Sequence, residues 1–268
     1  MSWSSLLIPC RLAFRARYAW LVIGCVVALL MAASLSALFS GRQPSTVALD
    51  VGISVMRLSL PLLLILLMQE LVSREFDRRY FLSSLSYPVS RLSFLLERFF
   101  AVVGMVLVAQ FLMAVSLAVL VVLVGKGYVQ SSPVNLGLPY VVTMGFMSLD
   151  LLVLCAVALL LAVVASTPSF VLVGTFGFML IARSYSAIIE LLLRETYVVD
   201  NPDGYRAGLG MLGYLLPDLG RLDVRMVALY GYWDFIPGDW CVLLVSSLIY
   251  ICVLLCLSVW LLERKLFS

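Results

Sequence analysis

Six long apolar runs constrain this chain more than any other feature, because each is near or above the roughly 20 residues that a bilayer-spanning helix needs. The chain as a whole is 63% hydrophobic and 12% charged, whereas soluble domains carry about 25% charged residues. The strict apolar–polar alternation of membrane β-barrels is absent from the sequence. We therefore predict one all-α membrane domain over residues 1–268, with six transmembrane helices. The predicted spans are Tyr18–Phe39, Val51–Val72, Phe99–Val124, Tyr140–Ala165, Ser169–Leu193 and Trp240–Leu262.

Basic residues are distributed unevenly among the segments that connect the apolar runs. With both termini in the cytoplasm, ten Lys and Arg residues lie on the cytoplasmic side and six on the other, four of these in one long loop. The positive-inside rule favours this orientation, because long loops have little weight in it. The 17 residues before the first run include three arginines, which favours a retained anchor over a cleaved signal peptide.

The longest segment expected outside the cytoplasm, residues 194–239, is unusually apolar. It contains the apolar, glycine-rich stretch AGLGMLGYLLPDLG. Non-helical backbone is tolerated at membrane depth only where it is buried in protein or lines a water-filled cavity. We expect the segment to lie in the interface or to re-enter between helices. Its GLGMLG matches the dinucleotide pattern G-x-G-x-x-G, but it follows no strand and opens no βαβ unit, so the glycines indicate a tightly packed loop. The other two segments on this side, residues 40–50 and 125–139, are expected to be short loops.

The residue types that most enzymes and metal sites need are scarce. The chain has no histidine, which removes the commonest general acid–base and metal ligand. Of the six cysteines, only Cys252 and Cys256 share a helix face, and packing is favoured over a soft-metal site for them. No complete P-loop is present. We predict no catalytic residue, no metal site, no bound cofactor and no nucleic-acid partner, so that any ATP-driven function requires a second polypeptide.

Ionisable residues within the predicted spans are candidates for function, because each is costly in hydrocarbon unless it is paired or hydrated. Asp150 and Arg183 are equally distant from the tight turn that joins the fourth and fifth spans, and two such positions face each other at equal depth in a helical hairpin. We therefore predict an Asp150–Arg183 ion pair or water-linked contact. It either fixes the helix register or lines a polar path. The remaining intramembrane charges are Arg57, Glu70 and Glu190.

A charged stretch, residues 73–98, connects the second and third spans on the cytoplasmic side. Glu75–Leu85 is predicted to form a short amphipathic helix, which Pro88 ends because proline disfavours helical conformation in the preceding residue. A second amphipathic helix is expected from Ser90 into the third span. The physical pattern leaves two interpretations open: a docking element for a cytoplasmic partner, or a solvated helix that attracts anionic lipid.

The arrangement resembles the permease subunits of ABC-2-type transporters, bacterial exporters whose six-span subunits pair with a separate ATPase. In that family an acidic residue after the second span leads into a coupling helix and a P-V-S-R-like turn, and a basic residue precedes the third span. The matching residues here are Glu75, Asp77, Pro88, Val89, Ser90, Arg91 and Arg98. The family often has Gly-Thr where this chain has Arg79-Tyr80. LLPDLGRLDVR before the last run and the closing helix with its basic tail are similar as well.

The resemblance implies a permease of the bacterial inner membrane that couples ATP hydrolysis by a separate ATPase to export. It implies two copies of that cytoplasmic ATPase, which would bind ATP and Mg²⁺, a second permease copy, and an N-terminal elbow helix over residues 1–17. The alternative is a subunit of the same type that transmits force to a periplasmic partner without transport. The residues that would contact the ATPase are Glu75, Phe76, Asp77, Arg78, Arg79, Tyr80, Phe81, Pro88 and Arg91.

Overall fold

The computed structural model of the chain describes residues 18–73, 91–126, 134–165, 167–194 and 217–264. Every regular element within these ranges is helical. The elements are α2 (Tyr18–Phe39), α3 (Pro44–Met68) with its π-helical continuation η1 (Gln69–Ser73), α6 (Arg91–Gly125), α7 (Leu138–Val164), α8 (Pro168–Arg194), α10 (Arg225–Tyr230), the 3₁₀ turn η2 (Trp233–Phe235) and α11 (Trp240–Arg264).

The described residues contain six helices that are long and apolar enough to cross a membrane, as the apolar runs predict. α2 has the predicted bounds, whereas the second span begins seven residues earlier than predicted, at Pro44. The predicted short loop over residues 40–50 is present but ends at residue 43, and Asp50 lies within α3. Proline suits the first turn of a helix because its missing N–H has no intrahelical partner there, and hydropathy alone does not detect a polar first turn. α6 begins at Arg91 and runs without a break through the predicted amphipathic stretch.

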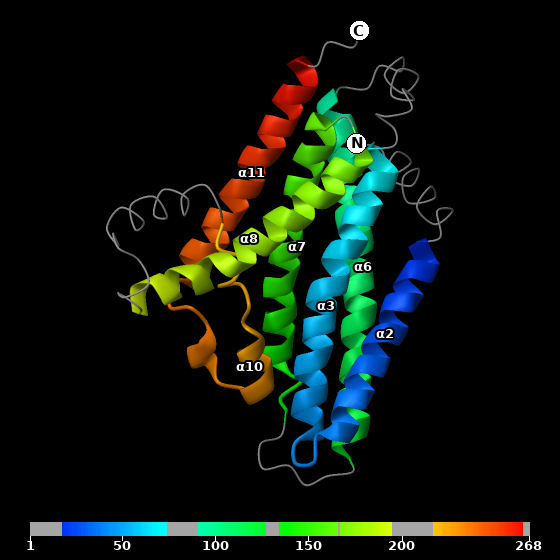
Figure 1. The fold of residues 1–268 in the computed structure, drawn as a ribbon, viewed down its shortest axis with the longest axis vertical. Coiled ribbons are helices and arrows are strands. Elements are labelled where there is room, and N and C mark those ends of the chain that lie inside the picture. The colour runs from blue at the N-terminus through cyan, green and yellow to red at the C-terminus, as the bar shows by residue number, and fades with distance from the viewer. Residues whose placement is uncertain (1–17, 74–90, 127–133, 166, 195–216, 265–268) are drawn as a thin grey trace.

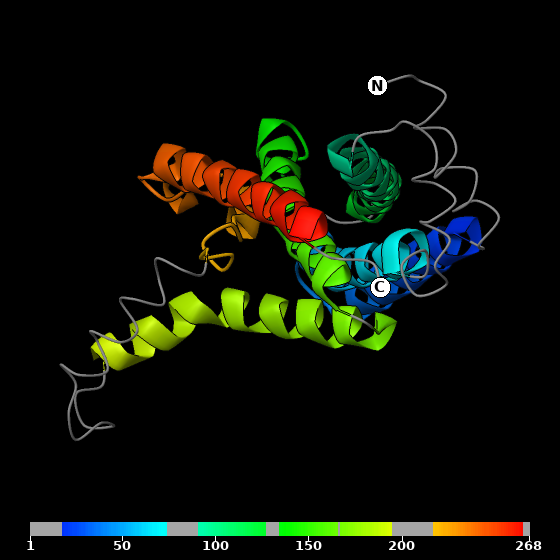
Figure 2. The same ribbon diagram turned by 90° about the horizontal axis from the view of Figure 1, so that it is seen from above.

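α7 is the central helix of the bundle, with α3 and α6 packed on one side and α11 on the other (Figures 1 and 2). In the most apolar stretch of α7, 72% of the residues are buried inside the protein, whereas the corresponding share in α2 is 22%. α8 is different, because it crosses the bundle at a steep angle to α3 and α7 and extends away from it toward its far end (Figures 1 and 2). α7 is therefore enclosed by protein, and α2 presents most of its surface outward.

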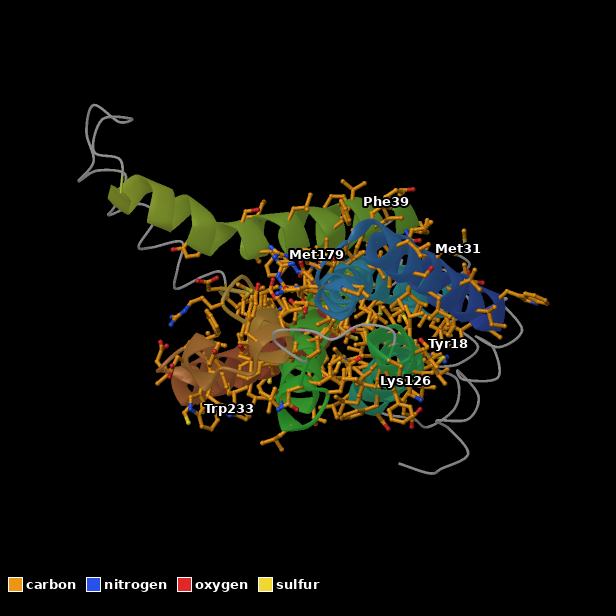
Figure 3. All side chains as sticks on the ribbon, turned by 90° about the horizontal axis from the view of Figure 1, so that it is seen from below. Tyr18, Met31, Phe39, Lys126, Met179 and Trp233 are labelled. Atoms are coloured by element: carbon orange, nitrogen blue, oxygen red, sulfur yellow. The ribbon has the colours of Figure 1, made fainter. Side chains whose placement is uncertain are left out.

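The outer surface of the bundle consists mainly of large apolar side chains. Trp20, Met31 and Phe39 on α2 are exposed, as are Val245 and Ile249 on α11. Seen from below, carbon atoms dominate the periphery, while nitrogen atoms gather near Met179 on the side of α8 that faces the bundle (Figure 3). An exposed apolar surface of this extent around a helical bundle is typical of contact with lipid.

A short connecting segment, residues 217–230, packs against α7 and α3 and is called the docked segment here. Several of its apolar side chains, among them Leu219, Leu222 and Val227, are fully or almost fully buried. It ends with α10, which is stopped by Gly231 in the left-handed conformation (φ 73°), where glycine is favoured because it lacks a Cβ. The predicted elbow helix (residues 1–17) and the predicted coupling helix lie outside the described residues.

Candidate functional site

The described residues include a network of charged side chains inside the bundle, at the place where α3, α7, α8 and the docked segment meet. Its centre is the predicted contact between Asp150 and Arg183: Arg183 Nη2 donates to Asp150 Oδ2 at 2.5 Å. Asp150 lies about 18 Å from the start of α7 and about 21 Å from its end, at 1.5 Å per residue. The ion pair predicted from the hairpin geometry is confirmed, and it is near the middle of a membrane-spanning helix.

The second link of the network joins Arg183 to the backbone of α3. Arg183 Nη1 donates to the carbonyl oxygen of Arg57 at 2.8 Å. In an α-helix that carbonyl would accept from the N–H of the residue four positions later, which here is Pro61. Proline has no N–H, so it leaves the Arg57 carbonyl without its usual donor. Arg183 supplies a donor in its place, which is the kind of compensation that a proline within a membrane-spanning helix requires.

The third link connects α3 to the docked segment. The guanidinium of Arg57 forms an ion pair with the carboxylate of Asp223. Arg57 is about 20 Å from the first residue of α3, at 1.5 Å per residue, so Asp223 reaches a charge deep in a spanning helix. Asp223 belongs to the segment before the last span, and its ion pair with Arg57 joins the described part of that segment, residues 217–230, to α3.

Arg225 extends the network toward the start of α3. Its guanidinium lies 3.6 Å from Asp223 and 3.3 Å from Asp50, and it donates to Ser54 Oγ at 3.1 Å. The contact with Asp50 lacks hydrogen-bond geometry, so it is a charge–charge contact. Asp50, Ser54 and Arg57 are spaced at i, i+4 and i+7, which places them on one face of α3. The docked segment therefore packs against a polar stripe on α3.

The network contains three aspartates and three arginines, so its formal charges balance. Exposure falls along it: the side chain of Asp50 is 46% exposed, that of Arg57 14% and that of Asp150 2%. Two charges taken out of water lose hydration that their attraction only partly offsets, so buried pairs are weak evidence for stability as such. Removal of one partner is strongly destabilising, because it leaves an uncompensated charge in an apolar environment. The network therefore constrains which elements must stay together.

A further ion pair joins the docked segment to the start of α11. Arg221 Nη2 donates to Asp239 Oδ1 at 2.5 Å, with both side chains nearly half exposed. The hydrogen bond from Arg221, together with a backbone hydrogen bond, holds the pKa of Asp239 below its usual value. This pair is in contact with solvent, where an ion pair contributes little to the free energy of unfolding.

A larger cavity, of about 460 Å³, lies at the other end of the bundle between α2, η1 and α8. Half of its lining residues are leucine or valine, such as Leu66 and Leu172, and Gln69 and Glu70 add polar groups. The Gln69 amide donates to the carbonyl of Pro168 at 2.6 Å and so connects the end of α3 to the start of α8.

The network includes all three of the intramembrane residues predicted as a polar site, Asp150, Arg183 and Arg57. Of the predicted ATPase contacts, only Arg91 is within the described part of the chain, where it begins α6. The others, from Glu75 to Pro88, lie outside the described residues. No group of three or more metal-ligating side chains occurs in the part of the chain that was described.

Sequence reasoning missed Asp223, Arg225 and Asp50. One signal was available: Arg57 is deep in a predicted span, and the hairpin geometry pairs Asp150 with Arg183. A charge in that position requires a counter-ion from elsewhere in the chain. The acidic residues of the loop before the last span were the remaining source.

The chain was compared with protein-family models and with curated proteins, and neither comparison gave a match.

Proposed function

We propose that this chain is the membrane-spanning permease subunit of an ATP-driven ABC-2-type exporter. It would pair with a second permease copy in the bacterial inner membrane, with both termini cytoplasmic. Two copies of a separate cytoplasmic ATPase would bind ATP and Mg²⁺, and their closure would act through the stretch from Glu75 to Arg91. The 460 Å³ cavity accords with an amphiphilic substrate, because its wall is mostly apolar and includes the polar side chains of Gln69 and Glu70.

The observation that carries the proposal is the position of α3. Together with η1 it forms one helical element from Pro44 to Ser73, and the predicted coupling stretch starts at the next residues. Toward its other end, Arg57 and Asp50 hold the docked segment by ionic contacts. A displacement applied where the coupling stretch begins would therefore be passed along a continuous helix to the opposite end of the bundle. A permease subunit driven from the cytoplasm needs such a connection.

The same connection supports a second candidate, a subunit that transmits force to a periplasmic partner. At the end of the docked segment and just after it, the chain exposes four aromatic side chains, Tyr230, Tyr232, Trp233 and Phe235. Aromatic residues are enriched in protein–protein contacts. Reconstitution separates the two candidates. ATP-dependent movement of an amphiphile across proteoliposomes supports the permease, and ATPase stimulation only by an added periplasmic protein supports force transmission.

The proposed function is tested first by isolating the tagged chain from its native membrane with its bound partners. We expect a Walker-type ATPase to copurify. Charge reversal at Glu75 or Asp77, or Ala at Tyr80 and Phe81, should uncouple ATP hydrolysis from transport. Leu38→Ala is a matched control, because Leu38 is 81% exposed on α2. Normal coupled transport in properly inserted coupling variants would refute the docking role, and activity without any ATPase would refute the proposal.

A further inference from the structure

A small cavity lies between the two ion pairs of the network. Its volume is about 10 Å³, at the lower limit of the roughly 10–15 Å³ that a single water molecule requires. Its wall includes charged residues of both pairs and one hydroxyl: Arg57, Asp150, Asp223 and Thr143. The other lining residues are Ile53, Met147, Leu222 and Val224.

One oxygen of Asp150 has no hydrogen-bond partner among the described residues. Asp150 Oδ2 accepts from Arg183, but Asp150 Oδ1 is buried and accepts from no group there. The whole residue is only 1% exposed. A buried acceptor without a donor is costly, more so when it carries charge, and native proteins commonly satisfy such atoms with an ordered water.

We propose that this cavity binds one water molecule, which bridges the Asp150 carboxylate to the Arg57–Asp223 ion pair. The water would donate one hydrogen to Asp150 Oδ1 and the other to an oxygen of Asp223 or Thr143. It would accept from the guanidinium of Arg57. This gives it about three hydrogen bonds, the usual number for a buried water. The two ion pairs then form one hydrogen-bonded unit that joins α7 and α8 to the docked segment. The site does not depend on the proposed function.

A second cavity of about 10 Å³ provides a matched control. It lies between α3, α6 and α7, and its wall is apolar except for Ser148. The Ser148 hydroxyl already contacts Gln110 Oε1 at 3.0 Å and the Met144 carbonyl at 2.9 Å. Apolar cavities stay dry because water finds too few partners there. The two cavities have similar volumes, so their hydration should differ only because of their chemistry.

The test is an experimental structure of the full chain in lipid nanodiscs, at a resolution that shows ordered water. We expect one density peak in the first cavity, at hydrogen-bond distance from Asp150 Oδ1, and none in the second. No peak in the first cavity, or the Arg57 guanidinium placed directly on Asp150 Oδ1, would overturn the proposal.

A pair of substitutions gives an independent readout, since each adds one methylene group to one cavity. Val224→Ile should displace the water and leave Asp150 Oδ1 without a donor, whereas Val106→Ile fills a dry space. We expect the thermal midpoint of Val224→Ile to fall by about 2–4 °C more than that of Val106→Ile. Equal shifts in the two variants would contradict the site. If Val224→Ile does not insert, the density in the unmodified protein decides the matter.

Discussion

Two buried interfaces of this bundle are held together in different ways. The packing of α2, α3 and α6 is apolar and close: a Cβ placed at Gly52 would lie only 2.3 Å from a methyl carbon of Leu117, which is itself fully buried. The junction of α3, α7, α8 and the docked segment is held by ion pairs and by a hydrogen bond to a carbonyl that Pro61 leaves free. The apolar interface depends on the fit between the shapes of its side chains. The charged junction depends on each charged side chain having a partner of opposite charge.

This difference has consequences for substitution. A shape-specified interface should tolerate loss of a polar group and reject volume added where its side chains are already in close contact. A charge-specified junction should tolerate a change of volume better than the loss of one partner.

The largest effect is expected from removing one partner of the central pair. Asp150→Asn or Arg183→Gln alone leaves an uncompensated or poorly satisfied group near the middle of a spanning helix, and breaking a buried pair typically costs about 3–5 kcal/mol. We expect the double variant to lose much less free energy of unfolding than the sum of the single losses. Unfolding of all three variants in matched nanodiscs measures this. Additive losses would show that the pair is not coupled.

Added volume at the apolar interface should have the next largest effect. Gly52→Ile inserts a branched side chain against Leu117, and overpacking of a well-packed core costs about 1–3 kcal/mol. Gly24→Ile is the matched control, because nothing lies within 4 Å of a Cβ built at Gly24 on α2. A lowered thermal midpoint is expected for Gly52→Ile alone. If both variants unfold at the same temperature, the interface is not limited by shape.

The bond between Arg183 and the backbone of α3 should depend on Pro61. Pro61→Ala restores an N–H that can donate to the Arg57 carbonyl. The carbonyl then no longer depends on Arg183 for a hydrogen bond. We expect Arg183→Gln to be less destabilising in the Pro61→Ala background, by about 1 kcal/mol, the typical net value of one hydrogen bond. A double-mutant cycle in the unfolding assay measures the difference. An unchanged cost of Arg183→Gln would argue against this role for Pro61.

The smallest effect is expected at Arg221 and Asp239, whose pair is open to solvent. Because Arg221 lowers the pKa of Asp239 below its ordinary value of 3.8, the pair contributes stability above that pH and loses it as pH falls through the lowered pKa. Arg221→Gln should remove this small acid-dependent contribution and leave unfolding near pH 7 almost unchanged. Unfolding midpoints from pH 7 to pH 3 test it. A large change at pH 7 would mean that the pair is shielded from solvent.

Much of the fold is readable from the sequence because membrane-spanning helices have a strong signal. Apolar length gives all six spans, and hairpin geometry gives the Asp150–Arg183 contact, since both depend on positions along neighbouring helices. The start of α3 was missed because Ser45 and Thr46 lower the hydropathy of a turn that Pro44 begins. The contact of Asp223 with Arg57 depends on how the docked segment packs on α3 and α7. The depth of Arg57 in its span indicates that it needs a counter-ion, but sequence spacing does not identify Asp223 as that partner.

The ion pair between Arg57 and Asp223 joins the docked segment to the membrane-spanning core. A double-mutant cycle with Arg57→Gln and Asp223→Asn, measured as free energy of unfolding in lipid nanodiscs, tests it most directly. We predict a coupling energy of at least about 1 kcal/mol, because residues in direct contact couple by roughly 0.5–3 kcal/mol. Losses that add to within about 0.5 kcal/mol, the behaviour of independent sites, would show that the two residues do not make this connection.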